Sequence, residues 1–243
     1  MHHFEEVSST NALARQMMRE VGCEVQPGTV LIAEQQTGGI GRLNRVWMSP
    51  EGGIWATIVV KPDIDVEHTF VIMAAASLAL AKAIRHEFGL SALIQWPNDV
   101  FIGDKKVAGT TLELSADKGR IRYGLIGIGV DVNLSVEKAM PSLSDIVTSL
   151  SDELGHDVER AKFFAVFLKE FERRYTMILK GETEPLFREW RSLSHTLHRR
   201  VRIRTLHEGF DGEAIDIDER GALLVHRDDG DVERVIAGDC YLL

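Results

Sequence analysis

The hydrophobic positions along the chain follow two different periods, which together predict a mixed α+β fold. Short runs of β-branched and apolar residues, bounded by glycine or proline, are typical of buried strands. They predict strands at residues 30–33, 54–60, 93–96, 100–102, 106–114 and 120–132. Stretches with apolar residues three and four positions apart, or rich in Ala and Leu, predict helices instead. These cover residues 12–18, 67–88, 157–179 and 184–193.

The C-terminal part of the chain has a different pattern from the rest. Short strands are predicted at residues 201–204, 214–217, 222–225 and 232–235, with glycine-containing turns between them. Evenly spaced short strands of this kind are typical of a small barrel. We therefore expect a main α+β domain, residues 1–193, followed by a small five-stranded β-barrel domain, residues 194–243.

Composition and charge narrow the class of protein. The 243 residues are 44% hydrophobic and 27% charged, as in an average globular chain. Lys and Arg total 28 against 37 Asp and Glu, and the net charge of −9 argues against a globally basic nucleic-acid binder. The longest apolar stretch, residues 71–83, contains Lys82 and is shorter than the ~20 residues of a membrane span. Cys23 and Cys240 form no disulfide framework, so we expect a cytoplasmic location.

Residues 35–47 have the composition of a loop that binds a charged ligand. Three glycines allow backbone N–H groups to approach a ligand closely, and Arg42 and Arg45 are planar cations suited to phosphate or carboxylate. Asn44 offers an amide and Trp47 a flat aromatic face. The spacing matches neither a P-loop nor a GxGxxG fingerprint. A surface loop with solvated arginines is the alternative, and the loop alone does not decide between the two.

Two further segments place polar or small residues beside predicted strands. Gln-Trp-Pro-Asn-Asp-Val at residues 95–100 ends a strand, where ligands often lie, although Asn-Asp is also common in plain turns. Lys106 is followed by Val-Ala-Gly, so small residues next to a cation leave room for a ligand. Gly-Ile-Gly-Val-Asp-Val-Asn at residues 127–133 is compatible with a pocket wall or with ordinary strand packing.

Taken in order, these motifs resemble the biotin protein ligase family. They are Ser-Thr-Asn at residues 9–11, the loop at 36–47, Ser-Pro-Glu-Gly-Gly at 49–53, Trp-Pro-Asn-Asp-Val at 96–100, Lys-Val-Ala-Gly at 106–109 and Gly-Ile-Gly at 127–129. The resemblance covers nearly the whole chain. It implies a mixed-sheet catalytic domain of the biotin/lipoate ligase type with a C-terminal SH3-like β-barrel. Because the chain starts at the catalytic core, it also implies the monofunctional type, without an N-terminal DNA-binding domain.

The resemblance implies an ATP-dependent, AMP-forming ligase that converts biotin to biotinyl-5′-AMP and transfers biotin to a lysine of a biotin carboxyl carrier domain. It implies ATP and Mg²⁺ as cofactors, and a homodimer that binds neither nucleic acid nor membrane. The implied biotin-binding residues are Ser9, Thr10, Asn11, Gln36, Gly39, Gly41, Arg42, Trp96, Gly109 and Gly127. The implied ATP-binding residues are Arg42, Asn44, Arg45, Trp47, Asp131 and Asn133. The implied catalytic positions are Arg42, which bridges the biotin carboxylate and the α-phosphate, Lys106 and Gln95, with no certain metal ligand.

Two positions depart from the family pattern in a way that bears on chemistry. Gln95 stands where the family has a lysine that neutralises the reacting anions, and losing such a group typically costs ~3–4 kcal/mol. Asp131 replaces an asparagine, and a carboxylate beside phosphates is unfavourable unless Mg²⁺ or an arginine intervenes. Two main alternatives therefore stay open: a non-catalytic or weakly catalytic binder of biotin or biotinyl-AMP, and an acyl ligase of the lipoate and octanoate branch. A third is an α+β scaffold whose loop binds another nucleotide.

Overall fold

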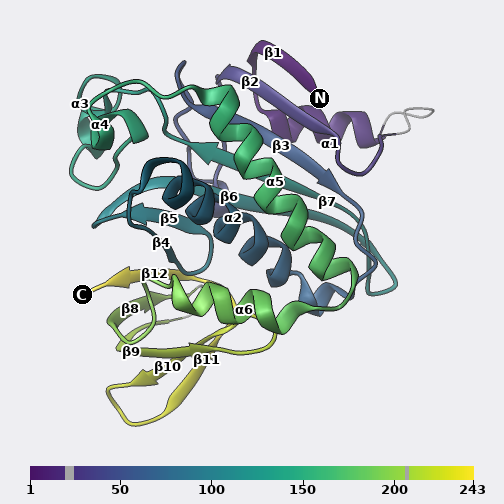
Figure 1. Cartoon of the computed structure of the whole chain (residues 1–243). Helices are drawn as coiled ribbons and strands as arrows, with labels where there is room; N and C mark the ends of the chain where they lie inside the picture. The colour runs from purple at the N-terminus through teal and green to yellow at the C-terminus, as the bar shows by residue number, and fades with distance from the viewer. Residues whose placement is uncertain (20–24, 206–207) are drawn as a thin grey trace.

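The computed structural model describes residues 1–19, 25–205 and 208–243, and its frame is two β-sheets (Figure 1). The larger sheet has seven strands in the order β1-β2-β3-β7-β6-β5-β4. β1 and β2 run parallel, whereas the other neighbouring strands are antiparallel, so the sheet is mixed as predicted. The strands are β1 (His2–Val7), β2 (Val30–Gln36), β3 (Ile54–Val60), β4 (Ala92–Gln95), β5 (Asp99–Ile102), β6 (Lys105–Asp117) and β7 (Arg120–Val130).

Helices cover both faces of this sheet. The long helices α2 (Phe70–Phe88) and α5 (Arg160–Leu179) lie together on one face, and α1 (Thr10–Arg19) lies against β2, β3 and β7 (Figure 1). α6 (Thr183–Ser192) leads to the C-terminal sheet. The remaining helical turns are α3 (Val136–Ala139), α4 (Leu150–Leu154), η1 (Arg42–Asn44), η2 (Val66–His68) and η3 (Pro141–Leu143).

β3 shows how the sequence specifies a strand that is buried on both faces. Side chains alternate across a strand, so Ile58 and Val60 face the core under α2, whereas Val59 faces the smaller core under α1. Every residue of β3 is buried, which explains why its sequence is a continuous apolar run rather than an alternating one. The strand was predicted with the bounds that the structure has, residues 54–60.

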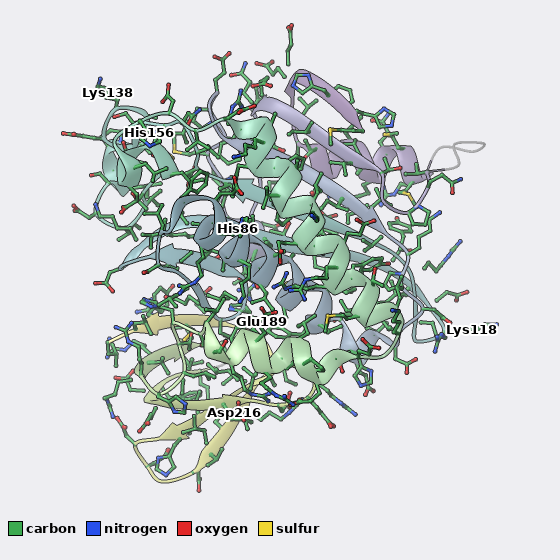
Figure 2. All side chains as sticks on the ribbon, viewed as in Figure 1. His86, Lys118, Lys138, His156, Glu189 and Asp216 are labelled. Atoms are coloured by element: carbon green, nitrogen blue, oxygen red, sulfur yellow. The ribbon has the colours of Figure 1, made fainter. Side chains whose placement is uncertain are left out.

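α2 is the central helix of the main core. An 18-residue window within the helical segment 66–88 is apolar enough for a membrane span, which corrects the expectation that no stretch has that composition. However, 67% of that window is buried inside the protein, and residues such as Ile72, Leu78 and Ile84 are fully buried. In contrast to this buried helix, charged side chains lie at the surface of the molecule. Lys118 at the tip of the β6–β7 hairpin and Lys138 on α3 are examples (Figure 2).

The C-terminal strands form an open sheet, so the predicted closed barrel is wrong. The order is β11-β10-β9-β8-β12, and β11 and β12 lie at its two edges instead of pairing with each other. The outer edge of β12 faces the main sheet, since the Cys240 carbonyl accepts a 2.9 Å hydrogen bond from Gln95. The strands are β8 (Arg200–Arg204), β9 (Gly209–Ile217), β10 (Leu223–Arg227), β11 (Val232–Val235) and β12 (Asp239–Leu242).

The two sheets share one hydrophobic core. Ile203 and Val225 of the C-terminal sheet belong to the same buried cluster as Ile72 of α2. Because both parts contribute to this core, the predicted domain boundary between residues 193 and 194 stays a prediction. Cys23 lies outside the described residues, and Cys240 is a buried free thiol.

Among the strands and α-helices of the described residues, β1, β12, α3 and α4 were not predicted. β1 is mostly exposed and its sequence, His-His-Phe-Glu-Glu-Val, has no apolar alternation to mark a strand. It forms because β2 offers a parallel edge, with Phe4 opposite Ala33.

Candidate functional site

A cavity of 290 Å³ lies between strands β6 and β7, the N-terminus of α1 and the loop that precedes β3. Twelve of the predicted site residues line it, and they come from segments far apart in the sequence. They are Ser9, Thr10, Asn11, Gln36, Gly41, Arg42, Arg45, Trp47, Lys106, Gly109, Gly127 and Asp131.

The floor of the cavity depends on glycines in two paired strands. Gly109 of β6 lies opposite Gly129 of β7, and the next outward-facing pair is Thr111 and Gly127. A Cβ atom on Gly129 would lie 2.7 Å from the Trp47 indole, and one on Gly127 would lie 2.3 Å from Thr111 Oγ1. A side chain at Gly127 or Gly129 would therefore occupy part of the cavity or clash with Trp47.

One end of the cavity is a fixed set of neutral hydrogen-bonding groups. The backbone N–H of Thr10 donates to Gln36 Oε1 over 2.8 Å, and Gln36 Nε2 donates to Ser49 Oγ over 2.9 Å. Asn11 Nδ2 donates to Glu113 Oε1 over 3.0 Å. Because each of these groups is held by another, this end presents donors and acceptors in fixed positions, as recognition of a polar ring requires.

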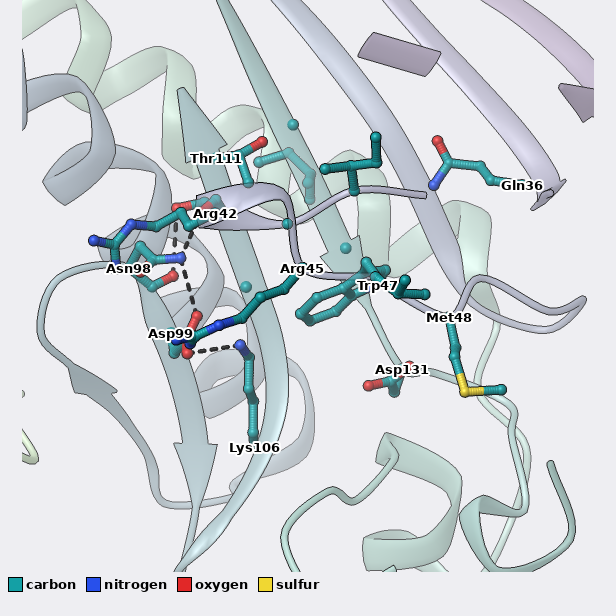
Figure 3. Close-up of a pocket in the computed structure, with 18 of the residues that line it drawn as sticks. Gln36, Arg42, Arg45, Trp47, Met48, Asn98, Asp99, Lys106, Thr111 and Asp131 are labelled. Carbon is teal, nitrogen blue, oxygen red and sulfur yellow. Dashed lines mark hydrogen bonds and ion pairs between the residues drawn. The ribbon is translucent and has the colours of Figure 1, made fainter. Parts of the chain in front are cut away.

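The opposite end holds the two cations predicted to be catalytic. Arg42 donates to Asn98 Oδ1 over 3.0 Å, and the Asn98 amide donates to Asp99 Oδ1 over 3.0 Å. Asp99 Oδ2 in turn lies 2.6 Å from Lys106 Nζ (Figure 3). Asn98 and Asp99 thus link the two cations and hold both at the same side of the cavity. Burial lowers the pKa of Arg42, although the charges of Asp99 and Asp239 act in the opposite direction.

The loop at the cavity mouth is attached to the C-terminal sheet. Arg45 forms a two-pronged ion pair with Asp239, and this hydrogen bonding raises the pKa of Arg45. Arg42 also donates to the Gly238 carbonyl over 3.1 Å. Trp47 folds inward, with Lys106 Nζ 4.7 Å from the centroid of its ring, within the range of a cation–π contact. The loop therefore closes the cavity by contacts to both sheets.

Asp131 lies in the wall of the cavity and is 3% exposed. Burial raises the pKa of its carboxyl to about 8, against an opposing effect of the Lys106 charge. Burial thus favours the neutral form of this carboxyl, and a negative charge at position 131 stays a prediction. Its Oδ1 atom has no hydrogen-bond partner among the described residues.

Gln95, which was predicted at the reaction centre, lies outside the cavity. It does not line the cavity wall, and its amide donates to the Cys240 carbonyl of β12. The structure thus does not bring Gln95 to the cavity with the other predicted catalytic residues, Arg42 and Lys106, and a role of position 95 in the reaction stays a prediction.

Four other predicted residues also lie outside the cavity wall. Asn133 exchanges two hydrogen bonds with the backbone of Val158, so its amide has a structural role. Trp96 is buried and donates to the Gly221 carbonyl, and Gly39 accepts a backbone hydrogen bond from Trp47 in the loop turn. Asn44 occupies the left-handed region, with φ of 58°, at the end of η1.

Sequence reasoning missed several residues of the cavity. Asn98 and Asp99 carried a signal in the Trp-Pro-Asn-Asp motif but were not assigned to the site. Thr111 follows from its pairing with Gly127 only once the strand register is known. Asp239 and the apolar side chains of Met140, Leu143, Ile146 and Val147 had no local signal, because their proximity to the cavity depends on the tertiary fold.

Comparison with known proteins places this cavity in a known family. The model of the biotin/lipoate A/B protein ligase family matches residues 4–131, and that of the biotin protein ligase C-terminal domain matches residues 196–243.

The bifunctional ligase/repressor BirA of Bacillus spizizenii is 35% identical over 237 residues, covering 97% of this chain and 72% of that protein. The biotin–acetyl-CoA-carboxylase ligase of Paracoccus denitrificans is 28% identical over 198 residues, covering 80% of this chain and 82% of that protein. The biotin protein ligase from Aquifex aeolicus in complex with biotin and ATP has a TM-score of 0.84 and 26% identity, covering 99% of this chain and 97% of that one. The chain therefore belongs to the biotin/lipoate A/B protein ligase family, and it carries the C-terminal domain of the biotin protein ligases.

Proposed function

We propose that this protein activates biotin with ATP and transfers it to a lysine of a biotin carboxyl carrier domain. The observation that supports this most directly is the cavity itself, with neutral hydrogen-bonding groups at one end, a glycine floor, and Arg42 and Lys106 at the other end. This arrangement fits a ligand with a polar uncharged ring, an apolar chain and a terminal carboxylate. The solved relative that is named as a complex with biotin and ATP agrees with the proposal.

In the first step, a carboxylate oxygen of biotin attacks the α-phosphorus of ATP. The bond between that phosphorus and the bridging oxygen of pyrophosphate breaks, which gives biotinyl-5′-AMP and pyrophosphate. Two anions must meet for this to happen, so cations that touch both of them lower the barrier. Arg42 is suited to bridge the carboxylate and the α-phosphate with its planar fork, and Lys106 provides a second positive charge.

In the second step, the amine of an acceptor lysine attacks the acyl carbon of the mixed anhydride. The new amide bond forms, AMP leaves, and the amine loses a proton. The loop that carries Arg42, Arg45 and Trp47 has to expose the anhydride to the carrier domain at this point. The contacts of Arg45 to Asp239 make the C-terminal sheet a support for that loop.

Mg²⁺ fits this site as an ion carried by the nucleotide. The described residues include no group of three or more His, Cys, Asp or Glu side chains placed to hold a metal. Oxygen ligands from phosphates and water would therefore complete its coordination, as is common for Mg²⁺ with nucleotides. Bound there, it would neutralise phosphate charge. A homodimer and a cytoplasmic location stay predictions.

The alternatives left open by the sequence are less well supported. A binder without catalysis was suggested by Gln95, but that residue lies outside the cavity, and Lys106 and Arg42 both line it. An acyl ligase for lipoate or octanoate is less favoured, because residues 196–243 match the biotin protein ligase C-terminal domain.

A labelled-ATP assay tests the proposal. The protein is incubated with ATP labelled at the α-phosphate, with and without biotin, and then with an apo carrier domain. We expect biotin-dependent adenylate and pyrophosphate, followed by biotinylation of the carrier; lipoate should not replace biotin.

Arg42→Ala should abolish adenylate formation while the fold is retained, since Arg42 lies on a loop. The matched control is Arg120→Ala. It removes an exposed arginine that does not line the cavity and that pairs with Asp63 and Asp65. Full activity of Arg42→Ala, or adenylate formation without biotin, would contradict the proposal.

A further inference from the structure

Glu113 of β6 lies just behind the cavity and holds a residue that lines it. Side chains two positions apart share one face of a strand, so Glu113 continues the row of Gly109 and Thr111 in the cavity floor (Figure 3). Glu113 itself does not line the cavity. Its Oε1 atom instead accepts a 3.0 Å hydrogen bond from Nδ2 of Asn11, which does line it. The carboxylate is therefore placed to act on the cavity through Asn11.

The carboxylate of Glu113 is fixed from its other side by α1. Arg15 donates from Nε to Glu113 Oε2 over 2.9 Å, and its Nη2 lies 2.7 Å from the same oxygen. Asn11 and Arg15 are four residues apart, so they lie on the same face of α1. The side chains of Arg15 and Glu113 are 40% and 38% exposed, and an ion pair this open adds little stability. What the pair provides is a defined position for the carboxylate between α1 and β6.

An asparagine side chain has two different ends, and Glu113 determines which way the amide of Asn11 faces. A carboxylate paired with an arginine only accepts hydrogen bonds, so it selects the NH₂ end of the amide. The Oδ1 end is thereby turned to the other side, where it accepts from the hydroxyl of Thr57, a fully buried residue of β3. A carbonyl oxygen has two lone pairs, so Oδ1 can accept a second hydrogen bond from a ligand. Without Glu113, the amide can rotate by half a turn and present N–H groups in place of that acceptor.

The amide of Asn11 lies against the floor of the cavity. A Cβ atom on Gly127 would lie 2.9 Å from Asn11 Oδ1 and 3.1 Å from Asn11 Nδ2, so the glycine leaves room for the amide. Nδ2 also lies 3.4 Å from Oγ1 of Thr111, which pairs with Gly127 across the two strands. The orientation of this one amide hence sets the hydrogen-bonding character of the floor at the end of the cavity that carries the neutral polar groups.

We propose that Glu113 is a positioning residue for biotin, which acts by orienting the amide of Asn11 so that Oδ1 accepts from an N–H of the ureido ring. Both nitrogens of that ring carry hydrogen, so a fixed acceptor recognises it, whereas a rotated amide would place donors against donors. The carboxylate of biotin reacts at the opposite end, beside Arg42 and Lys106, so Glu113 affects binding of the ring and not the chemical step. This inference rests on the proposed function, because it assigns the ureido ring to the neutral end of the cavity.

The first test compares KM for biotin and KM for ATP in biotin-dependent pyrophosphate exchange for the wild type, Glu113→Leu and Glu113→Gln. A hydrogen bond to a charged group contributes about 10- to 100-fold to an equilibrium. We therefore expect Glu113→Leu to raise KM for biotin by about tenfold or more, with kcat and KM for ATP unchanged. Glu113→Gln keeps an acceptor for Asn11 and should restore KM for biotin to within about fivefold of the wild type. The matched control is Asp117→Asn, which removes a charge from the exposed end of the same strand and should change neither KM.

The second test separates orientation of Asn11 from a tie between α1 and β6 that is only structural. Arg15→Met removes the partly exposed ion pair but leaves the hydrogen bond from Asn11 to Glu113, so KM for biotin should rise by less than about fivefold. In the double variant Asn11→Ala/Glu113→Leu, KM for biotin should equal that of Asn11→Ala alone, because no amide is left to orient. Effects of the two substitutions that multiply in the double variant would overturn the inference. An unchanged KM for biotin in Glu113→Leu, or a parallel rise of both KM values, would do the same.

Equilibrium binding of biotin to the wild type and to Glu113→Leu, measured by calorimetry, separates this inference from the proposed function. If the wild type binds biotin about tenfold or more tightly than Glu113→Leu but makes no adenylate, the function fails and the inference on Glu113 stands. If the wild type makes adenylate but the two proteins bind biotin equally, the inference fails and the function stands.

Discussion

The ammonium of Lys106 is held at the edge of the cavity by Asp99, with Nζ 2.6 Å from Asp99 Oδ2. The two residues come from neighbouring strands, β6 and β5, on either side of a tight hairpin. The same ammonium lies 4.7 Å from the centroid of the Trp47 ring. Its position is thus fixed by an ion pair from the sheet and by an aromatic ring from the loop, so a ligand meets a cation that is already oriented.

Lys106→Met should lower the rate of biotin-dependent pyrophosphate exchange by about 10²–10³-fold, because one positive charge at the reacting anions is lost. The measurement is kcat at saturating biotin and ATP. Lys105→Met is the matched control, since that lysine is exposed and donates to the Ser144 carbonyl. A Lys106→Met enzyme with normal kcat would show that this ammonium does not act on the reaction.

Gln95→Lys should change the exchange rate by less than about twofold, rather than raise it by the 10²–10³ that a new cation at the reaction centre would provide. The side chain at position 95 points to the Cys240 carbonyl and does not reach the cavity. A lysine there can make the same hydrogen bond. An increase of tenfold or more would mean that position 95 does contact the reacting groups.

The stability of the protein should depend on pH through Asp131. The pKa of its carboxyl is about 8 when folded, against 3.8 as the ordinary value. Between these two pH values the folded state binds more protons than the unfolded state, so the free energy of unfolding falls as the pH rises. Asp131→Asn removes this effect. Its stabilisation relative to the wild type should be small near pH 4 and grow to the order of a few kcal/mol by pH 8, then level off.

Urea unfolding at pH 4.5, 6 and 8 measures this difference. The comparison with Asp104→Asn controls for removal of a carboxyl as such, because Asp104 is exposed. If the difference between Asp131→Asn and the wild type does not vary with pH, Asp131 is already ionised in the folded protein.

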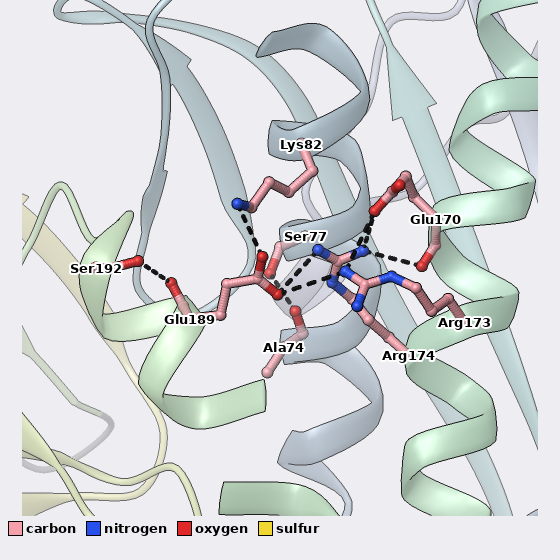
Figure 4. Close-up of polar contacts among 8 residues, drawn as sticks. All are labelled: Ala74, Ser77, Lys82, Glu170, Arg173, Arg174, Glu189 and Ser192. Atoms are coloured by element: carbon pink, nitrogen blue, oxygen red, sulfur yellow. Dashed lines mark hydrogen bonds and ion pairs between the residues drawn. The ribbon is translucent and has the colours of Figure 1, made fainter. Parts of the chain in front are cut away.

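A buried ion cluster joins three helices away from the cavity (Figure 4). Arg174 of α5 is completely buried and pairs with Glu170 of its own helix and with Glu189 of α6. Glu189 also pairs with Lys82 of α2 over 2.8 Å. Burial tends to raise the pKa of Glu189, but Lys82 and Arg174 together hold it below its ordinary value. The cluster therefore ties α6, which leads to the C-terminal sheet, to the main core.

Arg174→Leu should lower the free energy of unfolding by about 3–5 kcal/mol, because two partly buried carboxylates lose their one fully buried partner and keep only the more exposed Arg173 and Lys82. Arg173→Leu is a matched control on the same helix; that arginine is 55% exposed and its removal should cost less than about 1 kcal/mol. Urea unfolding monitored by circular dichroism provides both values. Equal effects of the two substitutions would show that burial of Arg174 adds nothing to its role.

Local sequence determined most of the elements and much of the candidate site. The apolar run of β3 and the Ala- and Leu-rich α2 were identified because burial on both sides leaves a continuous apolar sequence. The arginines of the loop and Lys106 carry chemistry that is visible residue by residue. The motif order also predicted the family, because those residue types at those spacings are specific to one kind of site.

Only the tertiary structure decided which of these side chains meet. Gln95 lies at the end of β4 and Lys106 lies in β6. The Gln95 side chain points to β12, whereas that of Lys106 points into the cavity. Strand register and pleat set the direction of each side chain, so the sequence alone does not distinguish the two. Asp239 approaches Arg45 across most of the chain length, which no local pattern records. The protonation of Asp131 likewise depends on burial by segments distant in sequence, so the sequence supplied the carboxyl and the fold determined its charge.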